Sequence, residues 1–228
     1  MKVPVLALCA CFVAAYALPQ TPAKDSMPKA TMPAAAAESR AQAADDVSAL
    51  IAGIEAELAG TEADVLFATA VVYPELLRYR QWRDTMESAL DRMLVCMGWE
   101  LECCSIGPLQ MKPSFAQAVE KEVSRSPVLK QKYAVLLPSA EPGSFADLTE
   151  RVNRLKYLHW ECLYLRAFLE ICGQRHGLAG KSDLYRLEIS AAAYNAGFML
   201  PLQQLEKLRG LDYVKKVSAY WSSRALSR

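Results

Sequence analysis

The sequence has almost no net charge, very little histidine and no long stretch of uncharged apolar residues. Its 228 residues include 26 basic and 25 acidic side chains and only two histidines. Proteins that bind nucleic acid normally show a basic excess or patch, so this balance argues against nucleic acid as a partner. A membrane-spanning helix needs about 20 apolar residues, which no segment provides. The neutral balance is compatible with a carbohydrate ligand.

Several catalytic signatures are also missing. There is no Gly-rich phosphate loop, no Gly-x-Ser-x-Gly turn and no His-Glu-x-x-His helix, which argues against the enzyme classes that these motifs define. No two cysteines have Cys-x-x-Cys spacing, so neither a metal site nor a cofactor is expected. A cysteine nucleophile at Cys103 or Cys104 acting with His159 is conceivable, but a structural histidine is favoured.

The first residues have the layout of a secretory signal peptide. Met1 and Lys2 precede an apolar run and then the small-residue pattern that ends at Ala17, where cleavage is expected. Because Cys9 and Cys11 lie in a segment that loosely resembles a lipobox, lipidation at Cys11, with membrane anchoring, is the alternative. Both interpretations predict export to the periplasm or cell envelope.

The rest of the chain divides into a linker and one domain. Residues 18–44 are rich in Ala, Pro, Ser and Thr without a sustained apolar period, which predicts a flexible tether. Residues 45–228 are long enough for a single domain with its own core. The expected organisation is therefore a signal peptide over residues 1–17, a disordered linker over 18–44 and a folded domain over 45–228.

Five cysteines lie in the expected domain: Cys96, Cys103, Cys104, Cys162 and Cys172. In an oxidising compartment one or two disulfides are expected, joining the first three positions to the segment that carries the last two. A bridge between Cys162 and Cys172 is excluded if they share one continuous helix, because ten residues separate them.

Helical spacing of apolar residues runs through the whole domain, and no segment alternates convincingly with period 2. The fold class is therefore predicted to be all-α. Helices are expected near residues 45–60, 62–79, 82–97, 113–119, 129–136, 144–172, 183–197, 202–208 and 212–225. The one over 144–172, capped by Ser144, would be central or longest. Pro74 should kink or interrupt the second helix just before Glu75.

Three segments carry the functional signal. They are Tyr-Pro-Glu at 73–75, Ser-Ile-Gly-Pro-Leu-Gln-Met-Lys-Pro at 105–113 and Ala-Tyr-Asn-Ala-Gly at 193–197. Together and in this order they resemble the lysozyme-like superfamily, in particular lytic transglycosylases with the SLT domain and goose-type lysozymes. The family pattern is a catalytic Glu at a helix end, then Gly-x-x-Gln, then Ala-Tyr-Asn-Ala-Gly. The resemblance covers about residues 64–197 and implies a lysozyme-like helical domain.

The resemblance assigns a role to several residues. Glu75 would be the catalytic acid and base, with Tyr194 bonded to it or lining its pocket. Asn195 would contact the sugar at the cleavage point, Gln110 would bind glycan from the opposite wall, and Gly107 would let the backbone approach closely. Two further wall residues are expected: Ser105 and Met111.

The interval between Glu75 and Gly107 is about twice as long as in typical family members. Glu87, followed by Ser88, superficially resembles the family's Glu-Ser and lies closer to Gly107. Glu75 is preferred because it follows Pro74 in an apolar segment, where burial would raise the pKa of its carboxyl and keep it protonated.

The resemblance implies a peptidoglycan lytic transglycosylase that cleaves the β-1,4 bond between N-acetylmuramic acid and N-acetylglucosamine and leaves a 1,6-anhydro ring. A hydrolytic muramidase is the near alternative, and would need a second carboxylate such as Glu100 or Glu102. A non-catalytic glycan-binding envelope protein and a lipoprotein adaptor are further alternatives. The expected partner is the glycan strand of peptidoglycan, and no protein partner is indicated.

Overall fold

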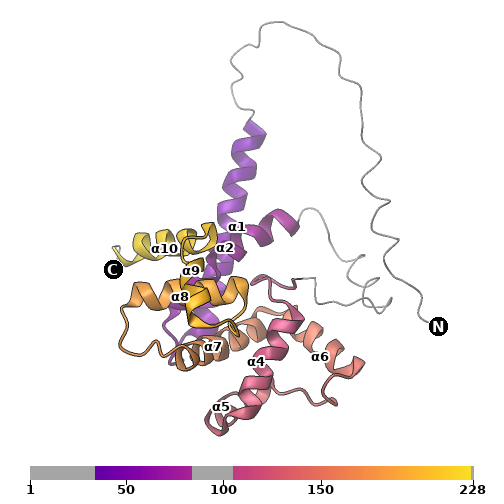
Figure 1. Ribbon diagram of the computed structural model, residues 1–228. Helices are drawn as coiled ribbons and strands as arrows, with labels where there is room; N and C mark the ends of the chain where they lie inside the picture. The colour runs from indigo at the N-terminus through magenta and orange to yellow at the C-terminus, as the bar shows by residue number, and fades with distance from the viewer. Residues whose placement is uncertain (1–33, 84–104, 227–228) are drawn as a thin grey trace, which may run out of the picture. The chain divides into compact units, whose positions relative to one another are not determined.

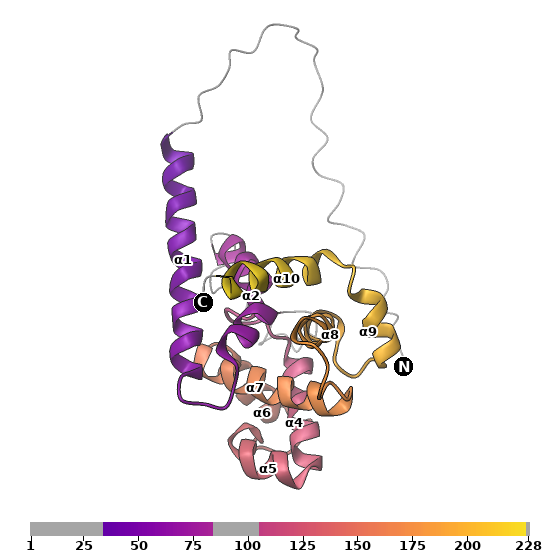
Figure 2. The same cartoon turned by 90° about the vertical axis from the view of Figure 1, so that its left-hand side faces the viewer.

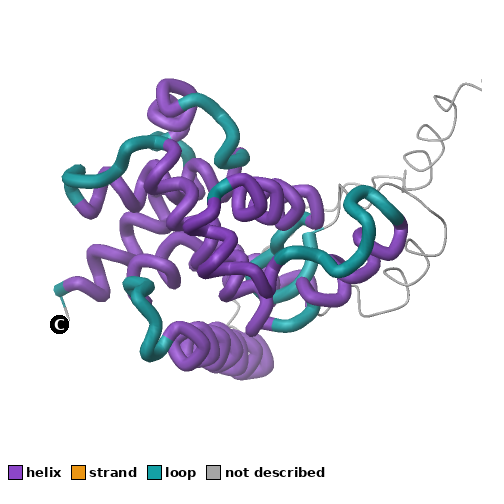
Figure 3. Tube along the Cα trace, turned by 90° about the horizontal axis from the view of Figure 1, so that it is seen from below, coloured by secondary structure: helices purple, strands orange, loops and turns teal. Residues whose placement is uncertain are grey.

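The described part of this protein is entirely α-helical. A computed structural model describes residues 34–83 and 105–226. Contacts divide the chain between Glu38 and Ser39, and all helices beyond the first residues of α1 belong to the second part. Within the described residues there are nine α-helices, one short 3-10 helix and no strand, which confirms the all-α prediction (Figure 3).

Within each of the two described ranges the helices follow one another through short connections (Figure 1). Their bounds are α1 Ala34–Leu58, α2 Val65–Arg83, α4 Pro113–Arg125, α5 Pro127–Tyr133, η2 Ala134–Leu136, α6 Phe145–Leu155, α7 Leu158–Arg175, α8 Asp183–Ala196, α9 Leu202–Leu208 and α10 Asp212–Ala225. The predicted bounds of the last two helices are confirmed. No helix in the described ranges has the length and apolar content required to span a bilayer.

Helix α7 packs against α2, α4, α5, α6 and α8 (Figure 2). Helices α2 and α8 also pack against α10. The core positions of α7 include Tyr164, Leu165 and Phe168, which are fully buried. Burial of such side chains contributes roughly 1.5–3 kcal/mol each. This arrangement holds the middle of α2 and the end of α8 in fixed positions on one core.

The predicted long helix over residues 144–172 is wrong, because it is two helices. Lys156 and Tyr157 interrupt it, and Tyr157 has extended backbone with φ −116° and ψ 127°. The apolar spacing of Leu155 and Leu158 continues across the break, so periodicity alone does not reveal it. The predicted cap is confirmed, since the Ser144 hydroxyl accepts from the Asp147 N–H at 3.1 Å.

The start of the domain also differs from the prediction. Helix α1 begins at Ala34 rather than near Asp45, so residues 34–44 are helical and not an irregular linker. Four consecutive alanines, Ala34 to Ala37, open this helix, and alanine has the highest helix propensity of all residues. The predicted signal peptide and the rest of the linker lie outside the described residues. So does the predicted helix over 82–97, except for Trp82 and Arg83, which belong to α2.

Cys162 and Cys172 are free, buried thiols on α7. The three cysteines predicted to bridge to this segment, Cys96, Cys103 and Cys104, lie outside the described residues. Burial raises the pKa of each thiol to about 12, so both stay protonated and behave as small apolar side chains. His159 pairs with the Glu57 carboxylate of α1, with its Nδ1 at 2.7 Å, and the conceivable nucleophiles Cys103 and Cys104 lie outside the described residues.

Candidate active site

Glu75 lies inside α2, among buried neighbours. The residue is only 7% exposed, and Val71, Val72 and Leu76 beside it are fully buried. Of the predicted kink or interruption at Pro74, the interruption is wrong, because α2 continues to Arg83. Proline removes only one helical bond, to the Ala70 carbonyl, and packing of α2 against α7, α8 and α10 holds the helix together across it. Glu75 is thus held within a continuous helix and not at a helix end.

Burial raises the pKa of the Glu75 carboxyl, and three groups oppose this shift. The Arg78 guanidinium, one turn along the helix, donates to both carboxyl oxygens at 3.1 and 3.3 Å. The Tyr213 hydroxyl and the Lys112 charge also favour the anion. Because desolvation dominates, the pKa of the Glu75 carboxyl lies above its ordinary value, which is the direction that a general acid needs.

Facing Glu75 is a tight hairpin formed by residues 106–111. Ile106 and Met111 pair as an isolated antiparallel bridge, with N···O distances of 2.9 and 3.0 Å. Between them Gly107 has φ +71° and Gln110 has φ +53°, a left-handed conformation that is uncommon for residues other than glycine. The Gln110 side-chain amide donates to the Gly107 carbonyl at 2.9 Å. This bond fixes the side chain that is predicted to bind glycan.

Gly107 packs against the break between α6 and α7. It is not among the described residues that line the groove around Glu75. A Cβ atom at this position would overlap the Leu155 carbonyl oxygen and lie 2.6 Å from the carboxyl carbon of Glu161. The packing of the hairpin against this break therefore requires glycine.

The peptide of Leu109 is held from two sides. Its N–H donates to the carboxyl oxygens of Glu161, at 3.1 and 3.2 Å, and its carbonyl accepts from the Tyr194 hydroxyl at 2.8 Å. Glu161 comes from α7 and Tyr194 from the end of α8. These two bonds fix the hairpin relative to both helices.

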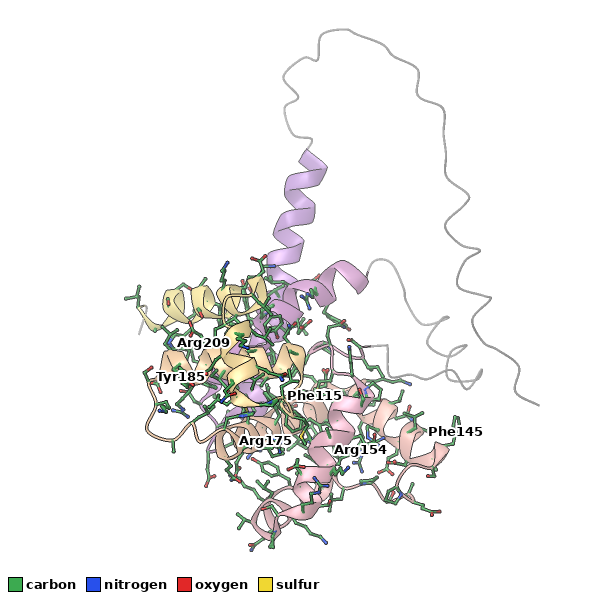
Figure 4. The ribbon with its side chains drawn as sticks, viewed as in Figure 1. Phe115, Phe145, Arg154, Arg175, Tyr185 and Arg209 are labelled. Carbon is green, nitrogen blue, oxygen red and sulfur yellow. The ribbon has the colours of Figure 1, made fainter. Side chains whose placement is uncertain are left out.

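Tyr194 therefore lines the pocket of Glu75, as one of its two predicted roles requires, while its hydroxyl bonds the hairpin. Its ring packs against Phe115 and Phe168, with centroids 5.2 and 5.5 Å away, and Phe115 lies at the inner side of α4 (Figure 4). Asn195 follows on the exposed side of the helix end. Gly197 then terminates α8, with φ +106° and its N–H bonded to the Ala193 carbonyl.

These segments enclose one groove of about 430 Å³. Its lining residues come from α2, the hairpin, α4 and the end of α8: Glu75, Arg78, Ser105, Gln110, Met111, Lys112, Ser114, Phe115, Ala118, Tyr194, Asn195, Ala196, Gly197, Phe198 and Met199. The structure thus brings together six of the seven residues predicted from sequence, and Gly107 is the exception. Glu75 is the only carboxylate among the described lining residues.

Sequence reasoning missed several residues of this site. Arg78, Lys112 and Phe115 line the groove, Tyr213 lies against Glu75, and Glu161 supports the hairpin from behind. The sequence contains one indication that Glu161 is unusual. This residue directly precedes Cys162 on the apolar face of its helix, where a carboxylate is rarely found. The others are brought in by packing between distant segments.

Glu161 is a fully buried carboxyl with no cationic partner in the described part of the chain. Burial raises the pKa of this group well above 4.5, against the opposing effect of the Leu109 and Met111 N–H groups. We expect Glu161→Ala to lower the free energy of unfolding by about 1–3 kcal/mol, because the buried Leu109 N–H loses its acceptor. Glu161→Gln keeps an acceptor and should cost much less. Urea denaturation at pH 7 measures both, and equal losses would contradict this role.

The raised pKa also fixes the sign of a pH effect. A carboxyl that holds its proton more tightly in the folded chain stabilises the fold fully below its unfolded pKa, and this contribution is lost as pH rises through the folded pKa. We expect the unfolding free energy of the wild type to fall with rising pH above about 4.5, and Glu161→Gln to weaken this dependence. An unchanged slope in the variant would show that other groups cause it.

No cluster of three or more His, Cys, Asp or Glu suited to a metal occurs in the residues that the structure describes. Asp64, which precedes α2, caps this helix by accepting from the Phe67 N–H at 3.0 Å. Glu87, Glu100 and Glu102 lie outside the described residues. No family model matches the chain, and neither the curated proteins nor the solved structures contain a significant match.

Proposed function

We propose that this protein is an exported glycosidase of lysozyme-like fold that cleaves the glycan strands of peptidoglycan, with Glu75 as its catalytic acid and base. The observation that carries the proposal is the convergence of Glu75, Gln110, Tyr194 and Asn195 on one groove. These residues come from three segments that were selected by sequence resemblance alone, and they are separated by up to 120 positions (75 to 195).

The state of Glu75 supports the acid role. Protonation of a glycosidic oxygen needs a carboxyl that remains neutral near neutral pH, and burial supplies that shift. An open groove with hydroxyl, amide and aromatic groups suits a chain of amino sugars, which present both polar edges and apolar faces. A periplasmic or envelope location, as the first residues predict, would place the protein beside this substrate.

A lytic transglycosylase is the form of the reaction that we propose. Most glycosidases use two carboxylates, whereas Glu75 has no second one among the described residues of the groove. Glu75 would first protonate the leaving oxygen and then, as carboxylate, remove the proton of the C6 hydroxyl of the muramic acid, which attacks C1. The product is a 1,6-anhydro sugar, and no cofactor is needed.

Mass spectrometry of the products tests this proposal. Purified protein is incubated with peptidoglycan, and the new chain ends are analysed. Products lighter than hydrolysis products by one water are expected. Only reducing ends would indicate a hydrolytic muramidase, in which Glu100 or Glu102 could position water. No cleavage at all, with glycan still bound, would indicate a non-catalytic binding protein.

The two polar groove residues give a further prediction. Gln110→Ala and Asn195→Ala are each expected to reduce kcat/KM on peptidoglycan roughly 3- to 10-fold, since each removes about one hydrogen bond to a sugar. The melting temperature should change little for Asn195→Ala, because this side chain is exposed. Gln110→Ala also loses the bond to the Gly107 carbonyl and should cost about 1 kcal/mol of stability. Gln117→Ala, on the exposed side of α4 and outside the groove, is the control. A large loss of thermal stability with unchanged turnover would assign both residues to structure.

A further inference from the structure

The groove has few charged side chains, and basic ones outnumber acidic ones. Among its described lining residues, Glu75 is the only acid, and Arg78 and Lys112 are the only bases. Lys112 is exposed and forms no ion pair within the described residues. When Glu75 holds its proton, the groove therefore has two cations without a balancing anion. Such a surface favours a ligand with negative charge.

Arg78 is a cation of the groove that such a ligand can reach. Its side chain is 55% exposed, whereas that of Glu75 is 9% exposed. The guanidinium lies over the Tyr213 ring, with 5.7 Å from Cζ to the ring centroid, and Nη1 makes both bonds to Glu75. A guanidinium presents its donors in a planar fork that matches a carboxylate, so this exposed side chain can turn from Glu75 to bond a ligand carboxylate with two parallel N–H groups.

We infer that Arg78 selects a carboxylate-bearing saccharide, and that the ligand's carboxylate replaces Glu75 as the partner of Arg78. This inference rests on the proposed glycan-binding function and adds to it the charge of the substrate. Once Arg78 bonds the ligand, Glu75 loses the largest of the groups that favour its anion. The buried carboxyl then retains its proton until the glycosidic oxygen accepts it. Substrate binding thereby favours the protonated form of Glu75, which is the form that acts as the general acid.

Two sources of the ligand carboxylate share this chemistry: the lactyl group of a muramic acid without peptide, and the carboxylates of a stem peptide. Binding of defined saccharides to the full chain distinguishes them. The ligands are a tetrasaccharide of alternating N-acetylglucosamine and N-acetylmuramic acid, the same compound with its carboxylates converted to amides, the peptide-bearing form, and neutral tetra-N-acetylglucosamine. Isothermal titration calorimetry at low salt gives each dissociation constant.

We expect the wild type to bind at least one carboxylate form about 10-fold more tightly than the amide, consistent with a charge-assisted hydrogen bond. Arg78→Gln should reduce this preference to about 2-fold or less and leave affinity for the amide unchanged. Arg125→Gln is the matched control. Arg125 is 58% exposed and also bonds a Glu three residues away, but it lies outside the groove.

Equal affinity of the wild type for acid and amide forms would overturn the inference, as would an equal loss of both in Arg78→Gln. Cleavage is measured in parallel on peptidoglycan. An Arg78-dependent preference without cleavage would support the inference while the catalytic proposal fails. Cleavage without such a preference would do the reverse.

Discussion

Replacing Glu75 by glutamine is expected to abolish glycan cleavage while the protein remains folded. The amide preserves the shape of the side chain but cannot donate the required proton. Loss of general acid catalysis alone costs on the order of 10²–10⁴ in rate, and this variant also loses the base of the second step. Release of soluble muropeptides measures the effect, and circular dichroism verifies the fold.

The stability of this variant provides a second, independent measurement. Because burial raises the pKa of Glu75, the carboxyl stabilises the fold at low pH, and this stabilisation is lost as pH rises through its folded pKa. Glu75→Gln should therefore lose less stability than the wild type between pH 4 and pH 8. Full activity in Glu75→Gln together with inactivity of Glu87→Gln would show that Glu87, and not Glu75, is the catalytic acid.

Gly107→Ala is expected to be the most destabilising single substitution in the groove region. A left-handed backbone costs a residue with a Cβ atom roughly 1–2 kcal/mol, and the added methyl group must also displace the Leu155 carbonyl or the Glu161 carboxyl. Overpacking typically costs about 1–3 kcal/mol, so a total loss of about 2–5 kcal/mol is expected. Chemical denaturation measures it.

Gly143→Ala separates the two contributions. Gly143 has φ +80°, but no heavy atom lies within 4 Å of the position that an added methyl group would occupy, so only the backbone strain should appear. If both variants lost the same stability, the contact between the hairpin and the α6–α7 break would have no energetic importance. If Gly107→Ala also weakened glycan binding more than its stability loss explains, the hairpin would be confirmed as a positioning element.

The sequence by itself determined the helical class, most helix positions and six of the 15 described residues that line the groove. Helical spacing and caps act over a few neighbouring residues, so Ser144, Leu202 and Asp212 could be read locally. The short motifs were also informative, because the local backbone conformation determines some of their residue types. Gly197, for example, ends α8 with a positive φ that favours glycine.

Tertiary structure decided how these residues act. The continuity of α2 through Pro74 and the break at Tyr157 depend on packing against other helices, which outweighs local preference. Glu161 holds Leu109 across 52 positions of sequence, and Tyr213 bonds the Val71 carbonyl, beside Glu75, across 142. Burial, charge and the partner of each polar group are properties of the folded chain, because only folding removes water from around them.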